Sequence, residues 1–150
     1  MKKYLLLILF IFVTACSNID LTKEKFLDMA SFDGYILENN KQGYEKYDYI
    51  KNVYYAIERE SAYDIQFIEL ESDEYAQKFF EVNKKELESV KTSSDYITRI
   101  NRNNYHVYHL ENASKYFLVL QNKNFIIYID APINYINEIE EFLKDLELEY

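Results

Sequence analysis

The sequence predicts a single α+β domain over residues 22–150, in which an antiparallel sheet of about five or six strands has two long helices packed on one face. A chain of 150 residues that is 49% hydrophobic can bury one core but not two. Short β-branched and aromatic runs between polar turns indicate antiparallel strands. Two longer segments repeat apolar residues at helical spacing, which indicates the helices.

The first half of the domain is predicted to contain a short helix, three strands and a long helix. Thr22 can cap the short helix, which continues to Ala30 and ends before Gly34. Strands are expected over 35–37, 53–58 and 65–70, the last two as a hairpin, and 39–49 is expected to be a loop. Ser72 can cap the long helix. Its apolar stripe consists of Ala76, Phe79, Phe80, Leu87 and Val90, interrupted by Asn83.

The second half is predicted to begin with a polar turn over 92–104. Strands are expected over 105–110, 116–120 and 125–129, and a final helix begins near Pro132 and Asn134. The apolar stripe of this helix consists of Ile136, Ile139, Leu143 and Leu146. Its opposite face carries Glu138, Glu141 and Asp145, which is typical of a helix face in contact with water.

An offset of 60 residues partly superposes the two halves. It places Ile65 on Phe125 and Phe67 on Ile127, and it also aligns the helices that follow. We therefore interpret the domain as two β-β-(β)-α halves. Because the two halves match in pattern and not in residue identity, this is a weak repeat.

The first 15 residues are typical of a secretory signal peptide. Lys2 and Lys3 precede an apolar run of ten residues from Tyr4 to Val13. As a helix, this run would be about 15 Å long, about half of the thickness of a hydrocarbon core. The run is therefore too short to cross a membrane alone.

The sequence Val13-Thr14-Ala15-Cys16 resembles the lipobox of bacterial lipoproteins, and Cys16 is the single cysteine of the chain. The resemblance covers residues 1–16. It implies that Cys16 receives a diacylglycerol thioether and that a signal peptidase cuts between Ala15 and Cys16. The implied organisation is a signal peptide over 1–15, a lipidated tether over 16–21 and the folded domain over 22–150.

Two acyl chains anchor a protein stably, whereas one binds only marginally. We therefore expect a domain held at the extracytoplasmic face of a cell membrane, with the lipid anchor on Cys16 as its contact with the bilayer. A tether of five residues, 17–21, reaches at most about 18 Å. The many Ile, Tyr, Lys and Asn residues, whose codons are AT-rich, indicate a low-GC bacterium.

Composition excludes several classes of function. A formal charge of −9 argues against nucleic acid as a partner, because phosphates require clustered cations. With only Gly34 and Gly43, the chain has no P-loop, nucleophile elbow or dinucleotide fingerprint. With Cys16 lipidated, no thiol remains for catalysis or zinc. We expect no catalytic residues, metal site or cofactor.

Two segments are candidates for contact with a partner protein or peptide at the envelope. The loop over 39–49 contains Tyr44, Tyr47 and Tyr49, and tyrosine supplies rigid contact area with a polar tip. The polar segment over 97–104 contains Arg99 and Arg102, whose guanidinium groups suit carboxylates or phosphates. Codon bias and core packing also account for the tyrosines, and an ordinary surface loop accounts for the arginines.

Three functions remain open. The first is a non-enzymatic binding or accessory module. The second is an inhibitor or immunity-type lipoprotein that captures a basic toxin or hydrolase through its acidic surface. The third, an enzyme, would need a concave site that gathers His106, His109, Glu69 and Glu71. His106 and His109 are three residues apart in an expected strand and should face opposite sides of the sheet.

The lipobox gives the first testable prediction. In cells grown on labelled palmitate, Cys16→Ser should abolish incorporation of the label, leave the precursor uncut and release the protein from the membrane fraction. The neighbouring Ser17→Ala variant should behave as the wild type. Normal cleavage and membrane retention of Cys16→Ser would contradict the lipoprotein assignment.

Overall fold

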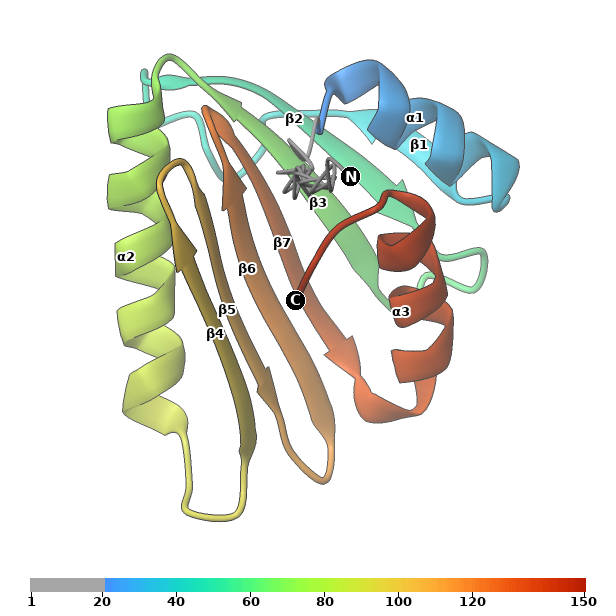
Figure 1. Ribbon diagram of the computed structural model, residues 1–150. Helices are drawn as coiled ribbons and strands as arrows, with labels where there is room; N and C mark the ends of the chain where they lie inside the picture. The colour runs from blue at the N-terminus through green and yellow to red at the C-terminus, as the bar shows by residue number, and fades with distance from the viewer. Residues whose placement is uncertain (1–20) are drawn as a thin grey trace, which may run out of the picture.

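The computed structural model describes residues 21–150 (Figure 1). The predicted signal peptide over 1–15, the predicted cleavage site at Ala15 and the predicted lipidation site at Cys16 lie outside the described residues. The elements are α1 (Lys23–Phe32), β1 (Ile36–Asn39), β2 (Ile50–Ile57), β3 (Asp64–Leu70), α2 (Asp73–Val90), β4 (Tyr96–Arg102), β5 (Tyr105–Glu111), β6 (Lys115–Asn122), β7 (Phe125–Pro132), a 3₁₀ turn (Ile133–Tyr135) and α3 (Ile136–Asp145).

The strands of the described chain form one antiparallel sheet in the order β1-β2-β3-β7-β6-β5-β4. This confirms the α+β class, with seven strands in place of about five or six. The additional strand is β4, which forms within the segment 92–104 that was expected to be a turn. As an edge strand with mostly exposed or half-buried side chains, β4 lacks the apolar alternation that identifies strands in a sequence.

Both predicted caps form. The Thr22 side chain accepts a hydrogen bond from the Lys25 N–H group, and the Ser72 side chain accepts one from the Tyr75 N–H group. In α2, Asn83 donates its side-chain amide to the Phe79 carbonyl oxygen at 2.8 Å, which satisfies a polar group on a largely apolar stripe. The starts of α1 and α2 were therefore predictable from cap chemistry.

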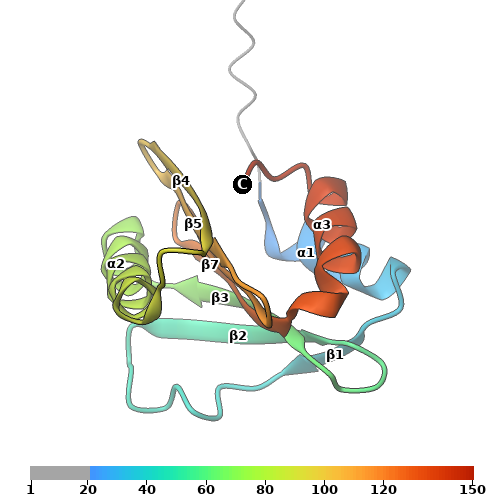
Figure 2. The same cartoon turned by 90° about the horizontal axis from the view of Figure 1, so that it is seen from below.

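The helices cover both faces of the sheet, and the prediction that they share one face is wrong. α1 and α3 pack on one face around Phe26, Phe67 and Phe142, whereas α2 packs on the other around Phe80 and Ile68 (Figure 2). Phe67 and Ile127, which the 60-residue offset superposes, pair with each other across β3 and β7. The offset does not relate the ends of these strands, because β3 ends at Leu70 while β7 continues to Pro132 and a 3₁₀ turn follows.

His109 is buried on the face that α1 and α3 cover. Its side chain is 3% exposed and lies among the rings of Tyr96, Tyr116 and Tyr150, with the Glu111 carboxylate 3.6 Å from Nε2. Burial lowers the pKa of His109 from 6.5 to about 4, because it removes the water that would solvate the charged imidazolium.

The depressed pKa of His109 predicts an acid-sensitive fold. The unfolded chain binds a proton at this residue below pH 6.5, and the folded chain binds it only near pH 4. The free energy of unfolding should therefore fall by about 3 kcal/mol as the pH drops through this window. Urea unfolding from pH 7 to 4 should show a smaller loss in His109→Asn than in the wild type. His106→Asn is the matched control, and an equal loss in all three proteins would refute the prediction.

Candidate functional site

The loop that carries Tyr44, Tyr47 and Tyr49 packs over the face that α2 covers. All three side chains are half-buried, and Tyr44 donates its hydroxyl hydrogen to Gln66 Oε1 at 2.8 Å. The Tyr49 ring is nearly parallel to that of Tyr75 in α2, with centroids 5.0 Å apart. These tyrosines thus attach the loop to the domain, and this packing buries part of each ring.

Arg99 and Arg102 lie in β4 and not in a loop. Because they are three residues apart in a strand, they point to opposite faces. Arg99 pairs with Glu88 at the end of α2, and Arg102 pairs with Glu149 near the C-terminus. β4 and the tyrosine loop lie at opposite ends of the described sheet, since the loop leads into β2, so the two candidate segments do not form one site (Figure 1).

The four residues proposed for an enzyme are not gathered. His106 lies against Phe80 of α2 with ring centroids 5.6 Å apart, whereas His109 lies on the opposite face, as the spacing predicted. Glu69 accepts a hydrogen bond from the Asn52 side chain, and Glu71 is exposed between β3 and α2. That particular catalytic constellation is not formed.

A different site lies where three segments that are distant in sequence meet. The end of α1, the β2–β3 hairpin and α3 enclose a hollow of about 460 Å³. Its lining consists of Phe32, Asp33, Gly34, Tyr35, Glu58, Arg59, Glu138, Glu141, Phe142 and Asp145. We refer to this site as the acidic hollow.

Aromatic rings form the floor of the acidic hollow. The rings of Tyr35 and Phe142 meet edge to face, with centroids 5.3 Å apart. The hydroxyl of Tyr63 lies 2.8 Å from that of Tyr35 and donates to Glu138 Oε1 at 2.9 Å. Burial raises the pKa of Tyr35 to about 12. Tyr35 therefore stays neutral, and the Tyr63 hydroxyl holds the exposed Glu138 carboxylate beside these rings.

Gly34 shapes the rim. Its φ of +81° lies in the left-handed region, which glycine tolerates best. This conformation ends α1 and turns the chain toward β1. A Cβ atom here would lie 2.0 Å from Arg59 Nη2, so the missing side chain makes room for the guanidinium group. Arg59 donates from Nε to the Gly34 carbonyl oxygen at 3.0 Å. Beside them, Phe32 is 85% exposed.

The acidic hollow carries a net negative charge. Its lining holds five carboxylates and one cation, and none of these five makes an ion pair with another described residue. The pKa of Asp33 is raised by burial and then by the charges of Asp145, Glu141 and Glu138. A cation that joins these carboxylates would offset the repulsion that Asp33 experiences.

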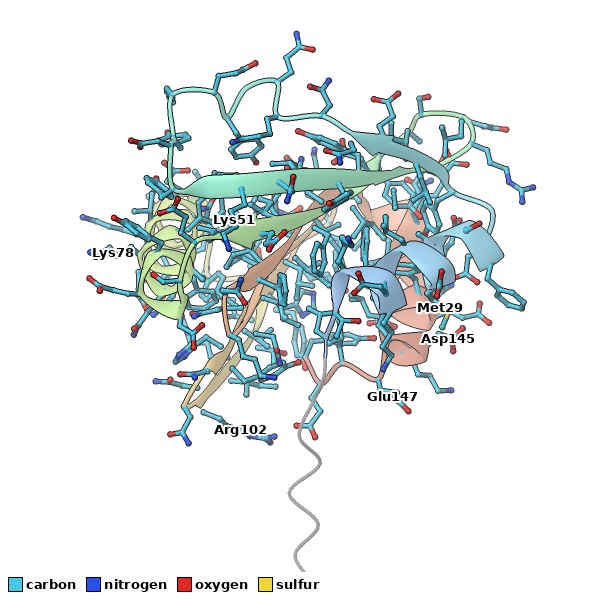
Figure 3. All side chains as sticks on the ribbon, turned by 90° about the horizontal axis from the view of Figure 1, so that it is seen from above. Met29, Lys51, Lys78, Arg102, Asp145 and Glu147 are labelled. Atoms are coloured by element: carbon cyan, nitrogen blue, oxygen red, sulfur yellow. The ribbon has the colours of Figure 1, made fainter. Side chains whose placement is uncertain are left out.

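The charge pattern of α3 was visible in the sequence, but its role was not. Glu138, Glu141 and Asp145 were expected on a helix face in contact with water, and all three are exposed. They lie opposite the end of α1, on the side of the molecule where Figure 3 places Asp145 and Met29. The sequence did not reveal the hollow because it does not show that α3 packs beside α1.

No protein-family model matches the chain, and no curated protein and no solved structure gives a significant match. None of the helices within residues 21–150 is long and apolar enough to cross a membrane. Over the same residues, no three His, Cys, Asp or Glu side chains are grouped to hold a metal ion. We therefore infer the function from the chain's own residues.

Proposed function

We propose that the protein is a lipid-anchored lipoprotein at the extracytoplasmic face of a cell membrane, and that its domain acts as a non-enzymatic binding module. The lipobox over 13–16 supports the anchor. The acidic hollow supports the binding role, and it is the observation on which the proposal depends. Its five carboxylates, aromatic floor and exposed Phe32 suit a basic side chain with an apolar stem.

The same charge pattern favours a more specific candidate, the capture of a basic toxin or hydrolase. A negatively charged recess speeds association with a positively charged partner and discriminates against acidic proteins. In addition, cleavage after Ala15 would remove Lys2 and Lys3 and no acidic residue, which increases the acidity of the mature chain. The charge of the hollow thus matches that of the whole protein.

The position of the hollow fits a tethered binding module. The described chain begins at Leu21, close to the C-terminal residues, where Lys25 Nζ lies 2.6 Å from Glu147 Oε2 (Figure 3). α1 then leads away from this point for ten residues, or about 15 Å, to Phe32 at the rim of the hollow. A short tether at the start of α1 would therefore leave the hollow open to the aqueous phase.

The proposal predicts that the hollow binds an isolated guanidinium compound. N-acetyl-arginine amide, titrated into the purified full chain in detergent and followed by NMR, should shift the resonances of Asp33, Glu138 and Glu141. The double variant Glu141→Gln with Asp145→Asn should weaken binding about tenfold, because two attractive charges are lost. Added salt should weaken binding to the wild type as well.

The matched control is Glu71→Gln with Glu86→Gln, which removes the same charge from exposed positions outside the hollow. This variant should bind like the wild type. Equal weakening in both double variants would show that net charge alone governs binding, and no binding to the wild type would refute the proposed function.

A further inference from the structure

The strand next to the acidic hollow is an open edge of the sheet. β1 pairs with β2 alone among the described strands, and all four of its side chains are exposed. Edge strands often carry Lys, Arg or Pro, which discourage pairing with another chain. β1, with the sequence Ile-Leu-Glu-Asn, has none of these. The edge of β1 therefore lacks the basic side chains and proline that most often block strand addition, and its remaining protections are its length of four residues and the charge of Glu38.

The hydrogen-bond pattern identifies the backbone groups that face outward. The Asn40 N–H group donates to the Val53 carbonyl oxygen at 3.0 Å. Because bonded pairs alternate along antiparallel strands, Glu38 and Ile36 also direct their backbone groups toward β2. Leu37 and Asn39 consequently direct theirs away from the sheet, where an added strand could bind them.

The side chains of this edge are apolar and accessible. Ile36 is 50% exposed and Leu37 is 39% exposed, and as neighbours in a strand they lie on opposite faces. An added strand would cover part of both. The other end of the sheet differs, because β4 carries Arg99 and Arg102 paired with Glu88 and Glu149.

The open edge leads directly into the acidic hollow. Gly34 and Tyr35 line the hollow, and β1 begins at the next residue, Ile36. A strand that pairs with β1 in the antiparallel sense, as every other pair in this sheet does, would run toward the hollow. The residue that follows its last paired position would meet the carboxylates.

We propose that β1 binds an extended segment of a partner by antiparallel strand addition, and that a basic residue directly after this segment enters the acidic hollow. This inference rests on the proposed function and specifies its partner as an extended, apolar segment that ends in Arg or Lys. Main-chain hydrogen bonds would provide affinity, and the charge of the hollow would set the register.

The test uses the peptide acetyl-Thr-Val-Thr-Val-Arg-amide and the full chain in detergent. The peptide should bind about tenfold more tightly than N-acetyl-arginine amide, because it adds main-chain hydrogen bonds and apolar contact. Asn39→Pro removes an outward N–H group and leaves the bonds to β2 intact. This variant should lose most of the tenfold gain, while Asn39→Ala keeps it and both variants bind N-acetyl-arginine amide normally.

Leu37→Pro, compared with Leu37→Ala, repeats the test at the second outward position. Equal affinities of the peptide and the arginine amide for the wild type would overturn strand addition and leave the proposed function standing. Peptide binding that is the same in each proline variant and its alanine control would also overturn it. Failure of both probes to bind the wild type would refute the proposed function and this inference together.

Discussion

The antiparallel pairing of β3 with β7 is the contact on which the rest of the fold depends. Phe67 pairs with Ile127 and Ile68 pairs with Ile126, so that successive residues supply the two faces of the sheet alternately. Both faces are apolar at this centre and both need cover. α2 covers one face, and α1 with α3 covers the other. Because the helices occupy the faces, the accessible chemistry lies at the ends of the sheet and at the junctions between helices and hairpins.

The sequence predicted most elements, because their signals are local. Thr22 and Ser72 cap helices as their positions indicated, and six strands lie close to the predicted runs. β4 was missed because an edge strand has little apolar alternation. The face that each helix covers was predicted wrongly because it depends on where the chain leaves the sheet. Phe67 and Ile127 pair with each other, whereas Leu70 and Pro132 end their strands at positions that the 60-residue offset does not relate.

The acidic hollow could be predicted from the sequence only in part. Glu138, Glu141 and Asp145 follow one helical stripe, and Gly34 marks the end of a helix, but nothing local brings them together. The tyrosines and arginines, which stood out in the sequence, instead link elements: Tyr49 stacks on Tyr75, and Arg99 and Arg102 pair with glutamates. These tyrosines and arginines therefore contribute to packing within the domain and do not line the candidate site. The lipobox at Cys16 remains the motif that predicts location.

The central claim is that the five carboxylates of the hollow, which make no ion pair with a described residue and share their lining with one cation, Arg59, bind a second cation from a partner. The pKa of Asp33 is sensitive to this charge, because burial and then the charges of Asp145, Glu141 and Glu138 raise it. A carboxyl ¹³C NMR titration, with and without saturating N-acetyl-arginine amide, measures this pKa. We expect a value above that of an ordinary aspartate in the unliganded protein and a fall when the guanidinium binds. An ordinary value that the arginine amide does not change would contradict the account.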